Sequence, residues 1–82
     1  MTNVNLIGVL KKENGAVFIE VVRAYKDQKG VFNKDLIPCL YWTKNDKNNL
    51  TYLPENSKLF IKGRLEVENQ KLYLIVEEFT LI

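Results

Sequence analysis

The chain has 82 residues, 46% of them hydrophobic and 27% charged, with a formal net charge of +2 at pH 7. This length and composition fit a single folded domain, residues 1–82, and exclude a disordered chain. Cys39 is the only cysteine and histidine is absent, so the sequence offers no internal disulfide, no conventional zinc cluster and no Cys-His nucleophile. We therefore expect no cofactor, no metal and no enzymatic activity.

No apolar run approaches the roughly 20 residues that a membrane span needs, and the N-terminus lacks the layout of a signal peptide. We therefore expect a cytoplasmic protein. The net charge is too small to indicate a nucleic-acid partner by itself, so any electrostatic argument depends on where the basic residues lie.

The first predicted strand covers residues 4–10, which are rich in branched aliphatic side chains. Gly8 inside this strand predicts a bulge or a tight bend. A turn follows, because Asn14-Gly15 supplies the positive φ angles that a hairpin loop requires.

The second predicted strand, residues 16–25, places Val17, Ile19 and Val21 on the core face. Strict alternation would also turn Arg23 and Tyr25 inward. Burying an unpaired arginine costs several kcal/mol, on the order of a broken buried ion pair. We therefore expect a bulge near Val22, or a strand that leaves the barrel, so that both side chains point outward.

A polar loop should then lead into the third strand, residues 35–42. Its core face holds Ile37, Cys39 and Tyr41, and its outer face holds Leu36, Pro38, Leu40 and Trp42. Pro38 lacks a backbone N–H, so it requires an edge, a bulge or an unpaired position. The residues up to Pro54 are expected to form a loop or one short helical turn.

The fourth strand, residues 58–67, is expected to curve at Gly63. Its inward residues are Leu59, Ile61, Leu65 and Val67, and its outward residues are Phe60, Lys62, Arg64 and Glu66. After a short turn at residues 68–70, the fifth strand covers residues 71–81. Alternation places Leu72, Leu74 and Val76 on one face of this strand and Tyr73, Ile75 and Glu77 on the other. Together with the fourth strand it predicts an exposed apolar patch of Phe60, Tyr73, Ile75 and Phe79. These elements describe an all-β fold, a five-stranded Greek-key barrel with a short turn or helix between strands three and four.

The residue pattern also points to a ligand. Trp42 ends one predicted strand, and another alternates apolar residues with Lys62 and Arg64. A flat aromatic surface beside positive charge is what single-stranded nucleic acid requires, because each base has a π-face and each linkage a phosphate. Three alternatives stay open: Trp42 as a rim aromatic that caps the barrel, Tyr25 as a packed side chain, and the basic residues as a solvated face.

Four segments in order resemble the bacterial single-stranded DNA-binding protein family, whose core domain is an oligonucleotide-binding (OB) fold. They are residues 3–10, 23–30, 35–42 and 58–65, and the resemblance covers essentially the whole chain. It implies that Tyr25 and Trp42 stack on bases and that Arg23, Lys26, Lys62 and Arg64 lie where basic side chains follow phosphates. Tyr73, with Phe60, is expected to be a base platform, a cross-strand partner or part of a subunit interface.

The chain also departs from the family pattern. Leu36 replaces a stacking aromatic, and the hairpin at residues 68–70 is short, so weaker binding or a smaller site is expected. In that family an acidic tail recruits repair and replication partners, and because the sequence ends at Ile82 without one, we expect no recruitment by that route.

The resulting prediction is a protein that binds single-stranded DNA without sequence preference during replication, recombination and repair. A homotetramer is expected first and a homodimer second. The alternatives are a protein-interaction OB module and a primosome-type dimer with weak DNA binding.

Overall fold

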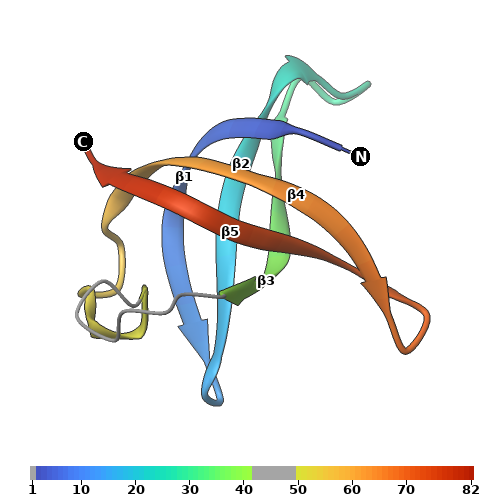
Figure 1. The fold of residues 1–82 in the computed structure, drawn as a ribbon. Helices are drawn as coiled ribbons and strands as arrows, with labels where there is room; N and C mark the ends of the chain where they lie inside the picture. The colour runs from blue at the N-terminus through green and yellow to red at the C-terminus, as the bar shows by residue number, and fades with distance from the viewer. Residues whose placement is uncertain (1, 42–49) are drawn as a thin grey trace.

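Five strands close into one barrel in the computed structural model, which describes residues 2–41 and 50–82 (Figure 1). The strands are β1 (Val4–Glu13), β2 (Ala16–Lys26), β3 (Phe32–Tyr41), β4 (Lys58–Glu68) and β5 (Lys71–Leu81). Their order around the barrel is β1-β2-β3-β5-β4, and every pair is antiparallel except β3–β5. A 3-10 helix (η2, Leu50–Tyr52) precedes β4. The predicted five-stranded barrel with a short helical turn before strand four is confirmed.

Two hairpins close through two-residue turns. Asn14 and Gly15 have φ angles of 51° and 80° between β1 and β2, and Asn69 and Gln70 have φ angles of 50° and 67° between β4 and β5. Two successive positive φ angles are typical of the turn whose twist matches the flanking strands. Because pairing continues up to the first turn, β1 extends to Glu13, beyond the predicted end.

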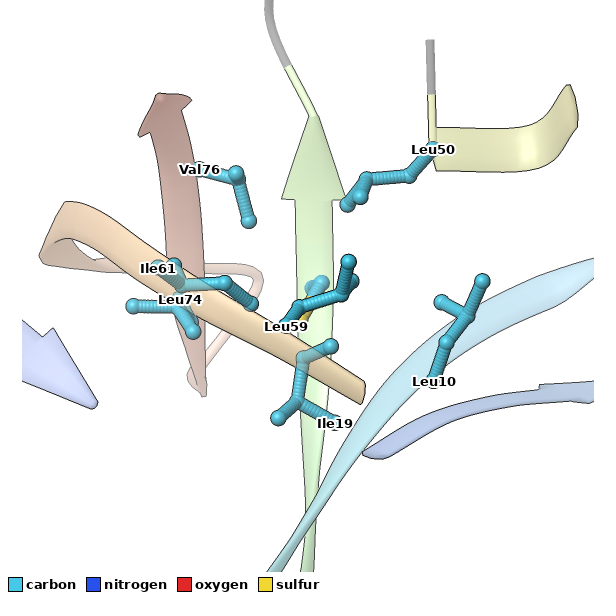
Figure 2. Close-up of a cluster of buried hydrophobic side chains, with 8 residues drawn as sticks. Leu10, Ile19, Leu50, Leu59, Ile61, Leu74 and Val76 are labelled. Carbon is cyan, nitrogen blue, oxygen red and sulfur yellow. The ribbon is translucent and has the colours of Figure 1, made fainter. Parts of the chain in front are cut away.

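The core fills the barrel with aliphatic side chains from four strands and from η2 (Figure 2). The fully buried residues are Leu10, Ile19, Leu50, Leu59, Ile61, Leu74 and Val76. Val17, Val21 and Ile37 pack against this cluster, so the predicted core face of β2 is confirmed. Leu50 enters from η2 and thereby anchors the helical turn to the barrel.

A β-bulge in β5 changes which of its side chains face inward. Lys62 of β4 pairs with Glu78, and the next residue, Gly63, pairs with Val76, so Glu77 is the extra residue. As a result Phe79 packs against the core. Ile75 is also buried, with 5% exposure. The predicted apolar patch that included these two residues is therefore wrong.

The β4–β5 hairpin extends past the barrel (Figure 1). The last pair between β1 and β4 is Val4 with Gly63. Beyond that point Thr2 Oγ1 hydrogen-bonds the backbone of Leu65, but no strand among residues 2–41 and 50–82 pairs with β4 on its β1 side. Leu65, Val67 and Leu72 are exposed as a consequence. The prediction that Leu65 and Val67 lie in the core is wrong, because this part of β4 extends beyond the end of the barrel core.

Candidate nucleic-acid interface

A bulge at the far end of β2 turns its last residues outward. Val22 pairs with Lys34 and the next pair is Lys26 with Phe32, so β2 carries extra residues that β3 lacks. Arg23 is exposed, as is Tyr25 at 64%. The predicted bulge is confirmed, and with it the outward position of both side chains. We call the segment beyond the bulge, residues 23–35, the β2–β3 arm.

Arg23 is paired with Asp35 within the β2–β3 arm. Its Nε donates to Oδ2 at 3.0 Å and its Nη2 donates to Oδ1 at 2.8 Å. This bond raises the pKa of Arg23 above its ordinary value and lowers the pKa of Asp35, and the charge attraction adds to both effects. Both side chains are more than a third exposed, so solvent screens the pair and it contributes little to stability. It nevertheless orients the guanidinium that was predicted to meet phosphate.

Asp27 organises the loop at the tip of the arm. Its Oδ1 accepts hydrogen bonds from the backbone N–H groups of Lys29 (2.8 Å) and Val31 (2.9 Å), and its Oδ2 accepts one from Asn33 Nδ2 (3.1 Å). Beside this loop Lys26 Nζ lies 5.5 Å from the centroid of the Phe32 ring, which is cation–π range. The tip is therefore ordered and carries a cation beside an aromatic ring.

Asp27→Ala should loosen this tip. The Val31 amide would lose its acceptor, so its hydrogen exchange should become several-fold faster, while the core amide of Leu74 keeps its rate. NMR-detected exchange at pH 7 measures both. An unchanged rate at Val31 would contradict the role of Asp27.

Acid should reproduce the effect of this substitution. The hydrogen bonds from Val31, Lys29 and Asn33 lower the pKa of Asp27, with the Val31 bond the largest contribution. A carboxyl with a lowered folded-state pKa stabilises the fold above its unfolded-state pKa, near 3.9. That stabilisation is lost as pH falls through the lower, folded-state pKa.

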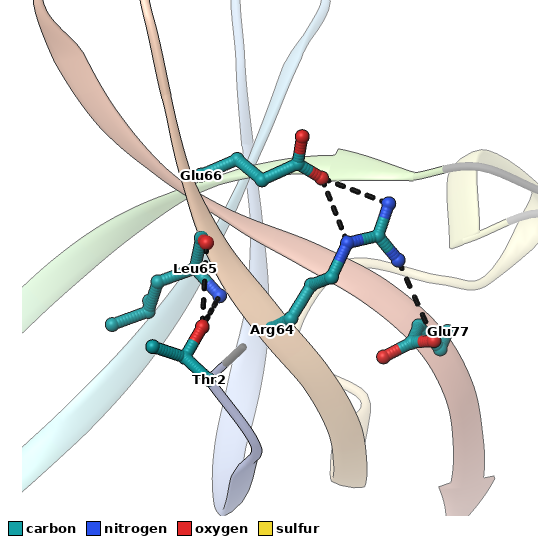
Figure 3. Close-up of polar contacts among 5 residues, drawn as sticks. All are labelled: Thr2, Arg64, Leu65, Glu66 and Glu77. Carbon is teal, nitrogen blue, oxygen red and sulfur yellow. Dashed lines mark hydrogen bonds and ion pairs between the residues drawn. The ribbon is translucent and has the colours of Figure 1, made fainter.

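The second predicted cation, Arg64, is surrounded by carboxylates (Figure 3). Its Nε and Nη2 both lie 2.8 Å from Glu66 Oε2, and its Nη1 lies 3.4 Å from Glu77 Oε2. Alternation predicts Arg64 and Glu77 on the outer faces of their strands, but it does not predict the register that pairs Arg64 with Ile75 and so brings Glu77 within reach. Lys62 pairs in register with Glu78, yet it forms no ion pair within the described ranges. The outer wall of β4 is therefore close to neutral rather than basic.

Tyr73 pairs with Glu66 across the hairpin and also lines a hollow of about 590 Å³. Its lining includes Phe18, Leu40 and Lys71, none of which the sequence singled out. Cys39 also reaches this hollow, and burial raises the pKa of its thiol to about 12. The thiol is therefore protonated at neutral pH and is no nucleophile.

The predicted site residues thus fall into separate groups. Arg23, Tyr25 and Lys26 are together on the arm. Lys62 and Arg64 lie on β4, where Arg64 pairs with Ile75 and Glu66 pairs with Tyr73 across the hairpin. Trp42 lies outside the described residues.

The described residues also bear on metal binding and on insertion into a membrane. No group of three or more potential ligands among them is placed to hold a metal ion. No helix among them has the length and apolar character required to cross a membrane.

Comparisons with known proteins give relatives and a structural neighbour, although no family model matches. Two proteins named single-stranded DNA-binding protein, from Bacillus cereus and Bacillus anthracis, are each 35% identical over 80 residues and match 84% of this chain. The chain spans about half of their length, 47% and 46% respectively.

A dimeric structure of the N-terminal domain of PriB protein from Thermoanaerobacter tencongensis superposes with a TM-score of 0.55 at 19% identity. It covers 99% of this chain and 96% of that one. At this identity the neighbour supports the fold alone, an OB barrel. The strand order agrees with it, and over most of its length the chain is similar to bacterial single-stranded DNA-binding proteins.

Proposed function

We propose that this domain binds single-stranded DNA without sequence preference, through base stacking and phosphate contacts. The β2–β3 arm carries the proposal, because Tyr25 presents its ring to solvent and the next residue, Lys26, is exposed with its ammonium over the Phe32 ring. Each nucleotide of an unpaired strand brings a π-face and a phosphate, which such a pair can bind together. The two relatives named single-stranded DNA-binding protein support this assignment.

In this proposal Tyr25 and Trp42 stack on bases, and Lys26 and Lys62 contact phosphates. Arg23 and Arg64 are already paired with carboxylates. Solvent-exposed ion pairs are weak, so a phosphate can replace the carboxylate at either guanidinium. These two arginines should therefore contribute less than Lys26 and Lys62, which form no ion pair in the part of the chain that the structure describes.

The biological role would be to protect transiently opened strands in the cytoplasm during replication, recombination and repair. A homotetramer is our first expectation and a homodimer the second. The exposed strip of Leu65, Val67 and Leu72 on the β4–β5 hairpin supports self-association, since contiguous apolar surface is commonly covered by a partner.

Fluorescence titration tests the proposal. Trp42 is the only tryptophan, so its emission should be quenched when poly(dT) is added. The quenching should weaken as salt rises, because phosphate contacts release counterions. No change at micromolar DNA and low salt would overturn the proposal.

Tyr25→Ala should lower the affinity for poly(dT) about 5- to 150-fold, the equivalent of about 1 to 3 kcal/mol for one stacked base. Tyr52→Ala is the matched control, because Tyr52 is also a solvent-exposed tyrosine, 72% accessible, but lies on η2. The Trp42 titration measures both variants. Equal losses in the two variants would refute the assignment of Tyr25.

A second candidate is a protein-interaction module that keeps the barrel but binds a partner protein. The neutralised wall around Arg64 favours it, because it removes positive charge from a surface that DNA would use. A folded protein that leaves poly(dT) unbound in the titration would favour this candidate.

A further inference from the structure

Asp35 holds Arg23 by the edge of the guanidinium that would also bind a phosphate. Two nitrogens, Nε and Nη2, donate to the two carboxylate oxygens at 3.0 and 2.8 Å. A guanidinium binds a phosphate through the same pair of parallel hydrogen bonds, because each anion presents two oxygens to the fork of N–H donors. In the free protein the carboxylate of Asp35 therefore occupies the position of a phosphate group.

The register of β2 and β3 accounts for this contact. Val21 lies opposite Asp35, and Arg23 is two residues further along β2. Arg23 is therefore the diagonal neighbour of Asp35, and long side chains reach such neighbours across a strand pair. The register shift begins after Val22, so the contact lies at the base of the β2–β3 arm. It depends on the pairing of the two strands and not on the loop at the tip.

Solvent reaches both partners of this ion pair. The side chains of Arg23 and Asp35 are 41% and 45% exposed. Exposed ion pairs gain little from their mutual attraction in water, whereas single-stranded DNA brings a row of phosphates to the same surface. A phosphate can thus approach from solvent and exchange with the carboxylate, and neither group has to leave a buried site.

The guanidinium of Arg23 lies within the proposed stacking region. The hydrogen bond and the charge of Asp35 raise the pKa of Arg23 most, and Tyr25, which is 64% exposed, adds to the rise. Arg23 is therefore near the ring that is proposed to stack on a base. Another cation of the arm is also held by a carboxylate, since Lys34 Nζ lies 3.6 Å from Glu20 Oε1. Carboxylates thus neutralise these two cations beside the stacking residue.

We propose that Asp35 is an intramolecular competitor for a phosphate of the bound strand. It occupies Arg23 in the free protein and is displaced from the guanidinium when a phosphate binds there. This inference rests on the proposed function and concerns the strength of binding at the same site. Because the ion pair must break before the phosphate binds, the contact lowers the affinity and lets the strand dissociate more readily.

A purely structural role for Asp35 predicts a change of the opposite sign. If the ion pair mainly tied β2 to β3, its loss would loosen the arm and weaken DNA binding. Competition predicts that its loss strengthens DNA binding. The sign of the change in affinity therefore distinguishes the two roles.

Asp35→Asn provides the first test, in the Trp42 titration with poly(dT). The amide keeps the size of the carboxylate and removes its charge. The affinity should rise about 2- to 5-fold, because an exposed ion pair no longer competes with the phosphate. The slope of log affinity against log salt should become steeper by up to about 0.7, since one more phosphate contact releases its counterion.

Glu68→Gln is the matched control for the loss of one negative charge. Glu68 is exposed at the end of β4, and across residues 2–41 and 50–82 no arginine is paired with it. Its affinity and salt slope should stay close to those of the wild type. An equal rise in both variants would mean that net charge alone sets the affinity, which would overturn the competition.

A double-mutant cycle tests whether the effect of Asp35 passes through Arg23. In an Arg23→Gln background, Asp35→Asn should leave the affinity and the salt slope unchanged, because no guanidinium remains to be released. The same gain with and without Arg23 would overturn the competition. Circular dichroism of the variants establishes that each is folded.

NMR on the wild-type protein follows the exchange directly and needs no stable variant of Asp35. Addition of an oligothymidylate should shift the Arg23 Nε–H resonance. It should also move the carboxyl carbon resonance of Asp35 toward its position in Arg23→Gln, where the carboxylate is free of the guanidinium. Unchanged resonances in a protein that binds the oligothymidylate would mean that the pair stays closed, and the competition would be wrong.

The outcomes also separate this inference from the proposed function. If the wild type binds poly(dT) and Asp35→Asn binds it equally or more weakly, the competition is overturned and the proposed function is kept. If neither protein binds, both are overturned. Binding by Asp35→Asn alone would support the competition and overturn DNA binding by the wild type.

Discussion

Gly63→Ala is expected to destabilise the barrel by about 3 kcal/mol or more. Gly63 lies where β5 bulges, and a Cβ there would collide with the carbonyl oxygen of Ile75 and approach its carbonyl carbon at 3.1 Å. Overpacking by one methyl group costs roughly 1 to 3 kcal/mol when side chains can move. Here the obstacle is backbone, so one of two paired strands must shift. Urea denaturation measures the loss against a total of about 4 to 12 kcal/mol for a domain of this size.

Gly30→Ala is the matched control for this substitution. Gly30 has a φ of 82°, but nothing lies within 4 Å of an added Cβ. Its cost should come from the backbone conformation alone, about 1 to 2 kcal/mol. If Gly63→Ala were no more damaging than Gly30→Ala, the close approach of β4 and β5 at the bulge would be wrong.

Leu74→Ala should have the other large effect, a loss of about 2 to 5 kcal/mol. Leu74 is fully buried and lies where β5 touches both neighbours, since it pairs with Leu65 of β4 and with Cys39 of β3. Truncation leaves a cavity at the junction that closes the barrel. The measurement is the free energy of unfolding from urea denaturation, followed by far-UV circular dichroism.

Leu72→Ala provides the comparison within the same strand. Leu72 precedes Leu74 by two residues and is 56% exposed on the hairpin beyond the barrel. The same change of side chain should cost only about 0.5 kcal/mol there. Similar losses at both positions would mean that Leu72 is buried in solution, most simply between two copies of the chain.

Hydrophobic alternation predicted the five strands and most of the core, because one buried face imposes a period of two on each strand. It also predicted the bulge near Val22, since Arg23 could not be buried without a partner. Alternation did not predict the bulge in β5. It falls at Glu77-Glu78, where two successive polar residues fit either register and give no signal.

The candidate site was predictable only where it depends on one strand. The exposure of Tyr25 followed from the argument about Arg23. Glu66 shares the outer face of β4 with Arg64, so alternation also predicted that carboxylate. By contrast, Glu77 reaches Arg64 from β5, and the hollow beside Tyr73 requires that β3 pair with β2 and β5 in succession. Alternation within a strand contains no information about such junctions.

The closure of the barrel has a consequence for the order of folding. Two hairpins end in two-residue turns, and such local units form in about 1 to 10 μs. The pairing of Val4 with Gly63 and the parallel pairing of β3 with β5 join distant parts of the chain, and their loop-closure entropy is lost before any contact compensates for it. We therefore expect the hairpins to form and unfold many times before β1 pairs with β4, so that barrel closure determines the observed folding rate.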